Sequence, residues 1–516
     1  MKKLFYILIV LAASLNVQAQ NSFLKAFTVY GDTAYKLYPG YHYFEGVAYS
    51  SFYPEHIFLI KTHRVTMSNG TVPYQDYLAF MKIDTSGNVI TEVNYYLGSE
   101  VNHEITAGKY NIDIDSNGDI LIASSWESSV SGNDGLYLWV DSDGNIQKSM
   151  IYGSWDSGQT GDDAGITAIK SLPTGQNGEE VYIAGGMSVS ANSSGCNSPF
   201  VAKIDKQSGL VKWWYELNQI TCGTFRGIHL YPTQELGLWT SDAYPYFTAL
   251  ARLDTAGNLL YMPKGYAFSG TEYLYNVNVL FASNNYHIFA GTYYNSNYPA
   301  IDSSLVLFAS DMNHNIVWSK KIRFQNKVDF DQGGHPLTLM EASDGMMYLA
   351  AGHGTHQQSR NGIILIKFNP NDGTILFVRD MGANLPDKDF VLNGVERMLE
   401  INNSLYFFGD EFILKTDMNG NWGDDCNDNR SVSYTEEPAP AITTANLASS
   451  SDITYGIGTV SLNTDSVLLF EESVYNGIPV ANITVTPNPA CEYSSVTITD
   501  NSQNANSYKL RIFDWS

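Results

Sequence analysis

Hydrophobic and polar residues along this chain alternate in short runs separated by turn residues, and no helical pattern lies between the runs. Residues 82–90 give the clearest example. A β-forming run ends at Asp84, a turn passes through Gly87, and a second β-forming run starts at Val89. Glycine supplies the positive φ of a tight turn, and Asp and Asn side chains hydrogen bond to the turn backbone. The stretch therefore predicts a β-hairpin.

This hairpin recurs along the chain. Its turn glycine returns at steps of 47 to 65 residues, at positions 87, 144, 209, 257, 314, 373 and 420, with His314 standing in the glycine position. A second turn followed by an apolar strand, such as 115–123 or 344–352, precedes each hairpin. One unit is then four short strands, which need about 40–50 residues. Seven repeated four-stranded antiparallel units predict an all-β, seven-bladed β-propeller.

The last unit lacks its fourth strand, because residues 422–425 read Trp-Gly-Asp-Asp after the final turn. Residues 23–30 resemble the fourth strands of other units, such as 316–321. Pairing them with the seventh unit would close the ring and remove an exposed sheet edge. We therefore predict that residues 23–30 complete the seventh blade.

The connections fall into two classes. Those between first and second strands and between third and fourth strands are tight, whereas the others are often long, as at 64–76, 125–135, 186–199 and 293–303. In a meander the long connections share one face, and binding sites concentrate on such loops. Aromatic side chains in or beside these segments are candidates to stack sugars or anchor a protein, with packing between blades as the alternative: Trp126, Trp155, Tyr244, Tyr246, Tyr293, Tyr294 and Tyr298.

Four cysteines allow three pairings. Cys196 lies in a second-to-third loop and Cys222 in the following blade-to-blade loop, so both fall on the long-loop face. We predict a Cys196–Cys222 disulfide, with two free thiols as the alternative. The pairing of Cys426 and Cys491 stays open.

Composition and the N-terminal segment bear on the partners and the location of the protein. The chain has 516 residues, 44% of them hydrophobic, and a net charge of −24, which argues against nucleic acid as a partner. Lys2 and Lys3, a short apolar run and a small-residue site at 17–19 predict a Sec signal peptide over residues 1–19. No later stretch is long and apolar enough for a membrane helix. We expect a secreted or outer-surface protein.

The amino-acid composition and the hydrophobic pattern change beyond Cys426. The propeller is expected over residues 20–426, and the Ser, Thr, Ala and Pro of residues 427–481 predict a linker with weak β content. Residues 482–516 alternate again and predict a small β-sandwich-like tail that is truncated.

This tail resembles the start of the C-terminal sorting domain of the type IX secretion system. The matching residues are 484–489, which read Thr-Val-Thr-Pro-Asn-Pro, followed by 496–498 and 510–514. The family's domain continues with a Gly and further strands, so residues 482–516 would be its first part. The resemblance implies the type IX secretion machinery as a partner. The repeats likewise resemble secreted bacterial propellers with Asp-rich, Gly-Asn turns, which implies a fold and no activity.

Three short motifs suggest chemistry. Residues 113–120 copy the opening of an EF-hand calcium loop, but Ser124 stands where the bidentate Glu belongs, so a hairpin turn is favoured. His353 and His356 are spaced for a metal without a carboxylate or Cys at characteristic spacing, so no metal site is assigned. The turns before Trp213 and Trp318 resemble the sialidase Asp-box, but their spacing differs, which favours packing for both Trp residues.

No catalytic residue is assigned, because the chain has no nucleophile elbow, triad order or phosphate-binding glycine loop. The sequence favours an exported, non-catalytic binding or scaffolding propeller whose ligand is a glycan or a protein on the long-loop face. One alternative is an extracellular polysaccharide-active hydrolase or lyase with its site at the central channel. A structural surface-matrix protein is the other.

Overall fold

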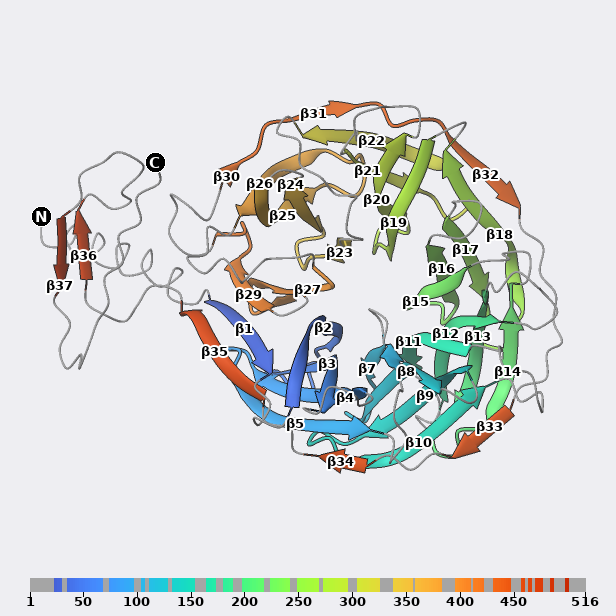
Figure 1. Ribbon diagram of the computed structural model, residues 1–516. Helices are drawn as coiled ribbons and strands as arrows, with labels where there is room; N and C mark the ends of the chain where they lie inside the picture. Colours follow the sequence, from blue (N-terminus) through green and yellow to red (C-terminus); the bar gives the residue numbers. More distant parts are fainter. Residues whose placement is uncertain are drawn as a thin grey trace, which may run out of the picture.

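The chain forms a ring of seven antiparallel sheets around a central axis, which confirms the seven-bladed propeller predicted from the repeats (Figure 1). The computed structural model describes residues 23–29, 35–67, 74–96, 104–106, 111–128, 132–153, 164–172, 180–188, 197–217, 223–241, 248–268, 272–295, 304–324, 337–355, 358–382, 395–409, 412–421, 430–446, 456–459, 463–465, 469–476, 483–486 and 497–500.

Each blade uses four strands in chain order, and the first strand lies innermost. The first three blades contain β2 (Tyr35–Ala48), β3 (His56–Met67), β4 (Tyr74–Asp84) and β5 (Val89–Tyr96); β6 (Glu104–Thr106) with β7 (Ile112–Ile114), β8 (Ile120–Ser128), β9 (Gly132–Val140) and β10 (Ile146–Gly153); and β11 (Ala164–Ser171), β12 (Glu180–Ser188), β13 (Asn197–Asp205) and β14 (Val211–Glu216).

The next three blades repeat the arrangement, and the seventh supplies three strands of its own. These blades contain β15 (Thr224–Leu230), β16 (Leu236–Ser241), β17 (Thr248–Leu253) and β18 (Leu259–Phe268); β19 (Glu272–Phe281), β20 (His287–Asn295), β21 (Ser304–Ser310) and β22 (Ile316–Phe324); β23 (Leu337–Glu341), β24 (Met347–Thr355), β25 (Gln358–Phe368) and β26 (Ile375–Gly382); and β27 (Arg397–Ile401), β28 (Ser404–Phe408) and β29 (Phe412–Asp417).

The N-terminal strand closes the ring. β1 (Phe23–Val29) pairs antiparallel with β29 of the seventh blade, with Phe23 opposite Lys415 and Ala26 opposite Phe412. This confirms the predicted closure. Because the first and last parts of the chain share one sheet, opening the ring would break a ladder of backbone hydrogen bonds.

Six short strands from the region after the propeller form an outer belt around the ring (Figure 1). Each pairs antiparallel with the outermost strand of one blade and so protects its edge. They are β30 (Arg430–Ser431) on β26, β31 (Tyr434–Glu437) on β22, β32 (Ile442–Asn446) on β18, β33 (Gly456–Thr459) on β10, β34 (Asn463–Asp465) on β5 and β35 (Leu469–Asn476) on β1.

The polar composition that predicts a linker also suits a strand on the outer surface. Glu436 binds Lys320 at 2.7 Å, and Glu437 lies 3.4 Å from Arg323. Tyr434 packs partly buried against the core between the fifth and sixth blades. The third blade carries no fifth strand among the described residues. Beyond the belt, β36 (Ile483–Thr486) and β37 (Thr497–Asp500) pair with each other.

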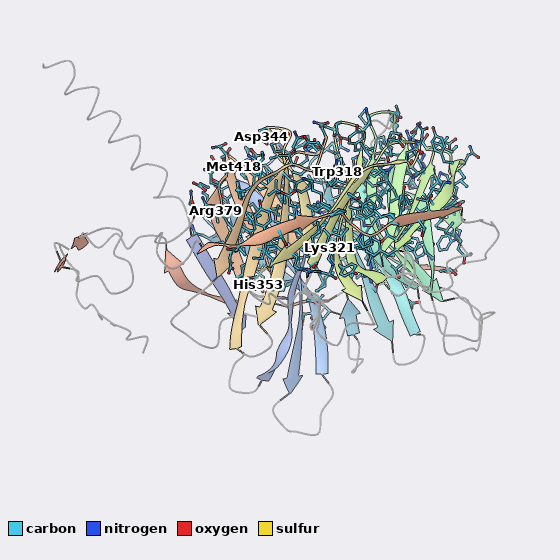
Figure 2. All side chains as sticks on the ribbon, turned by 90° about the horizontal axis from the view of Figure 1, so that it is seen from above. Trp318, Lys321, Asp344, His353, Arg379 and Met418 are labelled. Carbon is cyan, nitrogen blue, oxygen red and sulfur yellow. The ribbon has the colours of Figure 1, made fainter. Side chains whose placement is uncertain are left out.

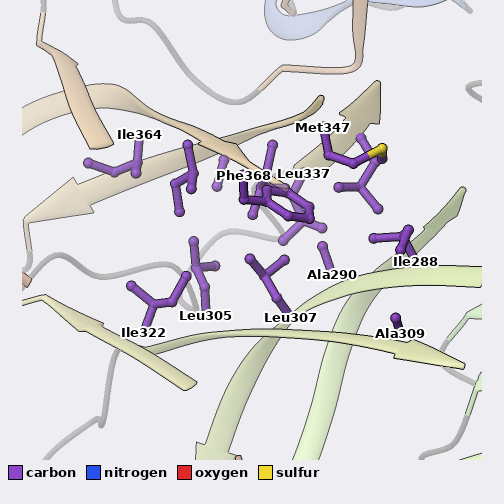
Figure 3. Packing of buried hydrophobic residues seen from close by; sticks show 14 of the residues in the cluster. Ile288, Ala290, Leu305, Leu307, Ala309, Ile322, Leu337, Met347, Ile364 and Phe368 are labelled. Carbon is purple, nitrogen blue, oxygen red and sulfur yellow. The ribbon is translucent and has the colours of Figure 1, made fainter. Parts of the chain in front are cut away.

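The hydrophobic core is divided among the junctions between neighbouring blades. A separate cluster of buried residues fills each of the seven junctions. In β21, Leu305 and Leu307 face the sixth blade (Figure 3), whereas Val306 and Phe308 face the fourth. Successive side chains of a strand point to opposite faces, so a strand between two blades is buried on both.

The repeated turns share one geometry. In the first, Asp84 accepts hydrogen bonds from the backbone N–H groups of Ser86 and Asn88 and from the Asn88 amide. The same pattern binds Asn145, Asn258, Asn315 and Asn421 to their turn carboxylates. These bonds to the charged form hold the pKa of turn carboxylates such as Asp254 below the ordinary range.

His314 takes the glycine position with a φ of 66°, as its place in the repeat predicts. Its ring Nδ1 lies 2.7 Å from the hydroxyl of Tyr266 in the neighbouring blade. That contact offsets part of the cost of a left-handed backbone at a residue other than glycine.

The ring has two faces. The tight-turn face carries the connections between first and second strands and between third and fourth strands, and the long-loop face carries the others. Figure 2 places Asp344 and Met418 towards one face and His353 towards the other. Two predicted long connections are shorter than expected: Ser125 pairs with Gly135 and Ser128 with Gly132, and Arg64 pairs with Asp76. In both places the two strands continue as a paired ribbon beyond the hydrophobic core. Backbone hydrogen bonds alone hold such a ribbon, so the polar residues of these segments do not end the strands.

Candidate functional site

The aromatic candidates of the long-loop face divide into three groups. Trp155, Tyr244, Tyr246 and Tyr298 lie outside the described residues, as do all four cysteines, the signal peptide and His356. Trp126 and Tyr294 are placed by their backbones only, within β8 opposite Asp134 and within β20 opposite Tyr273.

Tyr293 is the remaining candidate, and its side chain is buried. It belongs to the core between the fourth and fifth blades, and the Lys321 ammonium lies 3.7 Å from its ring centroid. This residue therefore takes the packing role that the sequence leaves open as the alternative. The Trp213 and Trp318 indoles also pack between blades, donating to the carbonyl oxygens of Thr255 and Pro370.

A pocket of about 440 Å³ occupies the central channel at its tight-turn end. Its walls come from innermost strands in every blade except the sixth, mostly near their carboxyl ends, together with Trp239 of β16. Its aliphatic lining residues pack mainly into the cores between blades, so polar groups form much of the surface that the pocket exposes. These aliphatic residues are Val47, Ile112, Ile169, Ile228, Val279 and Leu399.

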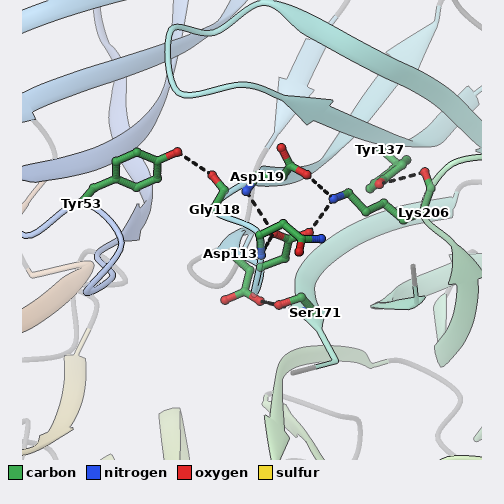
Figure 4. Close-up of polar contacts among 9 residues, drawn as sticks. Tyr53, Asp113, Gly118, Asp119, Tyr137, Ser171 and Lys206 are labelled. Carbon is green, nitrogen blue, oxygen red and sulfur yellow. Dashed lines mark hydrogen bonds and ion pairs between the residues drawn. The ribbon is translucent and has the colours of Figure 1, made fainter. Parts of the chain in front are cut away.

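The single carboxylate of this pocket is bound within the protein. Asp113 accepts a charge-assisted hydrogen bond from Lys170 at 2.6 Å through one oxygen. Its other oxygen accepts the Ser171 backbone N–H and hydroxyl, at 2.7 and 2.6 Å (Figure 4). Because both of its oxygens are engaged, Asp113 links the second and third blades. It is therefore poorly placed to act as a general base.

His229 also lines the pocket and is ionisable. Its imidazole stacks on the Phe281 ring at 4.7 Å and 13°, and it meets Tyr231 edge-on at 5.0 Å. Burial, helped by the positive charge of Lys170, lowers the pKa of His229 to about 4. The ring is therefore neutral at pH 7 and presents one N–H donor. Arg397 lies in the wall contributed by β27.

The calcium-like loop is a hairpin turn between β7 and β8, as favoured by the sequence. Asp115 and Asp119 both bind the Lys206 ammonium at 2.5 Å (Figure 4), and that ammonium also lies 4.2 Å from the Trp139 ring centroid. Lysine from the third blade thus neutralises the acidic turn of the second. Within the described part of the chain, no group of three or more His, Cys, Asp or Glu side chains could hold a metal ion.

His353 lies near the long-loop end of β24. It is buried, and its Nε2 lies 2.9 Å from the Asp380 carboxylate in the same blade. The contact ties two strands of one sheet.

Lys170, His229 and Arg397 carry the polar chemistry of the pocket, and the sequence did not single them out. Each lies on an innermost strand, Lys170 and His229 near its carboxyl end and Arg397 at the start of β27. The usable signal was a charged or imidazole residue within an otherwise apolar first strand.

Comparisons with known proteins assign no family to the chain. No protein-family model matches it, and no curated protein matches it. The fold defines a seven-bladed β-propeller. Among the described residues, no helix has the length and apolar character of a membrane span.

Solved structures with a similar chain course include three proteins of different kinds. A protein of unknown function from Dyadobacter fermentans is 12% identical, with 67% of this chain and 99% of that chain covered and a TM-score of 0.39. The polysaccharide lyase Uly1 is 10% identical, with 75% and 91% covered and a TM-score of 0.41. The propeller domain of the Trilobed protease from Pyrococcus furiosus is 9% identical, with 78% and 96% covered and a TM-score of 0.36. At this level of similarity, none assigns a function to this chain.

Proposed function

We propose that this chain is an exported, non-catalytic binding or scaffolding propeller that engages a glycan or a protein on its long-loop face. A signal peptide over residues 1–19 would export it, and the tail of residues 482–516 would be read by the type IX secretion machinery. The protein would then act outside the cell or at its outer surface.

One observation supports binding over catalysis. The carboxylate that lines the channel pocket and the two of the adjoining turn hold blades together: Asp113 binds Lys170 and Ser171, while Asp115 and Asp119 bind Lys206. A hydrolase or lyase needs a carboxylate or another base that is free to move a proton at the substrate. These three carboxylates already form ion pairs and accept hydrogen bonds, so they stabilise the fold and are not free to act as a base.

The long-loop face suits a ligand because a rigid ring carries it. Seven packed junctions fix the strands from which its connections leave, and rigid scaffolds with long connections are common binding surfaces. Trp126 and Tyr294, at the long-loop ends of β8 and β20, would offer flat apolar surfaces to a sugar ring or a protein partner.

A glycan array probed with the mature protein, beside a depolymerisation assay on the same sugars, tests this proposal. We expect retention of a glycan or a protein partner without release of product. Trp126→Ala and Tyr294→Ala should each weaken retention about tenfold or more. Phe52→Ala is the matched control, since Phe52 is an exposed aromatic on the tight-turn face.

Two results would reject the proposal. Release of shortened sugars would show a polysaccharide-active enzyme. An equal loss of ligand retention in Phe52→Ala and in the two long-loop variants would show that the ligand does not bind on the long-loop face.

A further inference from the structure

We propose that the pocket at the tight-turn end of the channel is a second binding site, and that its ligand is a small sugar acid with several hydroxyl groups and one carboxylate. The pocket is separate from the ligand surface of the long-loop face, because most of its lining lies near the tight-turn ends of the innermost strands. Its volume of about 440 Å³ is in the range of small-molecule pockets.

Backbone groups of the innermost strands favour a hydroxylated ligand. Among the described residues, each innermost strand that lines the pocket pairs with one neighbouring strand, so it forms the inner edge of its sheet. Such an edge leaves alternate N–H and C=O groups without a partner in the sheet. The aliphatic lining residues pack mainly into the cores between blades, so a ligand in the channel meets these backbone groups. Hydroxyl groups both donate and accept, and they therefore match this surface.

The charged side chains of the lining favour an anion. Lys170 and Arg397 are cations and Asp113 is the single carboxylate, so one positive charge is in excess among the described lining residues. His229 is neutral at pH 7, because its pKa is lowered to about 4. This positive site lies in a chain whose net charge is −24, so the local arrangement of side chains creates it against the overall charge.

Lys170 is the main donor to the carboxylate of the ligand. Its side chain is 37% exposed although it lies in the channel, and its ammonium spends one hydrogen bond on Asp113. An ammonium has three donors. Asp113 stays in place because its other oxygen accepts the Ser171 backbone N–H and hydroxyl. Lys170 can therefore donate to an incoming carboxylate while it keeps its ion pair.

His229 and Arg397 supply donors from two further blades. The His229 ring is held by stacking on Phe281 and by the edge contact with Tyr231, and among the described residues neither of its nitrogens has a hydrogen-bond partner. A neutral imidazole offers one donor and one acceptor, which suits a carboxylate or a hydroxyl group. Arg397, at the start of β27, brings a guanidinium with five N–H donors, so it can serve a ligand oxygen as well as a protein neighbour.

Two carboxylates outside the lining limit the ligand to one negative charge. Glu341 ends β23, and Glu400 lies near the end of β27, at the same end of the channel. Each accepts the backbone N–H and the hydroxyl of a serine in a neighbouring blade, Ser283 for Glu341 and Ser343 for Glu400. These fixed negative charges disfavour a second acidic group on the ligand.

Calorimetric titration of the full chain with glucuronate tests the site. Glucose carries the hydroxyl groups without the charge, and cyclohexanecarboxylate carries the charge on a ring of similar size without hydroxyl groups. We expect glucuronate to bind about tenfold or more tightly than glucose, since hydrogen bonds to charged groups are the stronger ones. Cyclohexanecarboxylate should also bind more weakly than glucuronate, because it leaves the backbone groups of the channel without hydrogen bonds from the ligand.

Variants locate the binding. Lys170→Met should weaken glucuronate binding by about tenfold, and His229→Phe and Arg397→Met by about threefold each, while Lys170→Arg should keep much of it. Lys212→Met is the matched control: Lys212 belongs to the same blade as Lys170, is 38% exposed and binds Glu180, but it lies on the outermost strand.

Four results would overturn the proposal: no glucuronate binding, equal affinity for glucuronate and glucose, equal or tighter binding of cyclohexanecarboxylate, or unchanged glucuronate binding in both Lys170→Met and His229→Phe. If Lys170→Met does not fold because Asp113 loses its partner, His229→Phe decides alone, since it keeps a stacked ring.

The long-loop variants separate this site from the proposed ligand surface. Trp126→Ala and Tyr294→Ala should leave glucuronate binding unchanged, because both residues lie at the other end of the blades. Loss of glucuronate binding in these two variants, with binding kept in Lys170→Met, would place the sugar acid on the long-loop face and reject the channel site. A failure to retain any glycan or protein on the long-loop face would leave the channel result intact.

Discussion

The hydroxyl of Tyr406 donates a hydrogen bond of 2.6 Å to the backbone carbonyl oxygen of Thr85 and so joins the seventh blade to the first. An aromatic side chain also joins one blade to the third-to-fourth turn of the next at each other junction. Five of these bonds run to backbone carbonyl oxygens: Tyr95 to Gly144, Tyr152 to Gly209, Trp213 to Thr255, Trp318 to Pro370 and Tyr348 to Met418. At the remaining junction the Tyr266 hydroxyl contacts the ring Nδ1 of His314. The repeated turn is therefore an acceptor for its neighbour as well as a connection within its own blade.

Removing one of these hydroxyls should weaken the ring. Tyr406→Phe leaves the Thr85 carbonyl without this donor, and we expect a loss of about 1–2 kcal/mol in the free energy of unfolding. Chemical denaturation measures it. Tyr261→Phe, at a residue that is 46% exposed, is the control and should stay within about 0.5 kcal/mol of the parent protein. Equal effects would show that the junction bond adds nothing.

Two turn glycines separate backbone strain from crowding. Gly373 has a φ of 69°, and a Cβ added there would lie 2.7 Å from the Trp318 ring. Gly345 has a φ of 75° with open space around it. Gly345→Ala should cost about 1 kcal/mol from the left-handed backbone alone. Gly373→Ala should cost clearly more, because the indole must also move. Matched thermal melts check this, and an equal cost would mean that the indole gives way freely.

Lys206 should be the most sensitive lysine of the described ring. It is buried between the Asp115 and Asp119 carboxylates, so Lys206→Met leaves two acidic groups without their cation. We expect a loss of about 3–5 kcal/mol in the free energy of unfolding. Lys212→Met, which removes a half-exposed ion pair, should cost about 1 kcal/mol or less. Denaturant titration compares the two, and similar values would contradict the assigned role of Lys206.

Stability should fall with acid through a buried histidine. His287 contacts Tyr231 and Ser310, and burial lowers its pKa to about 3. An unfolded imidazole has a pKa of about 6.5, so the unfolded chain binds the proton first. Full stability is therefore present above about pH 6.5 and is lost as pH falls towards 3, by on the order of 5 kcal/mol from this group.

The variant His287→Phe tests this cause. It should be less stable at pH 7, because it loses two polar contacts, but its stability should fall less steeply between pH 6.5 and 4. Melting temperatures across that range give the slope. A slope identical to that of the parent protein would assign the acid sensitivity to other groups.

The outer belt should protect sheet edges. Deleting residues 430–516 exposes the outermost strands of six blades, so we expect a lower melting temperature and association that grows with concentration. Deleting residues 477–516 keeps the belt and is the control. Light scattering after size-exclusion chromatography distinguishes the two. A monomeric, equally stable protein after the longer deletion would show that the belt is dispensable.

The sequence alone determined the local structure. The positions of Asp84, Gly87 and their repeats fix the turns, because only certain residues accept a left-handed backbone and bond to it. The turns set the strand count. The absence of a fourth strand in the seventh unit pointed to residues 23–30 as its replacement, and the structure has the strand at residues 23–29. These features depend on separations of a few tens of residues along the chain, and such separations can be read directly from the sequence.

Only the tertiary structure decided which side chains meet across blades. Lys206 lies 91 residues from Asp115, and Lys170 lies 57 residues from Asp113, and no pattern in the chain links either pair. The belt was equally hidden, since a polar strand on an outer edge has the composition of a linker. Such contacts depend on the closed ring, which brings distant turns together by geometry and leaves little trace in local sequence.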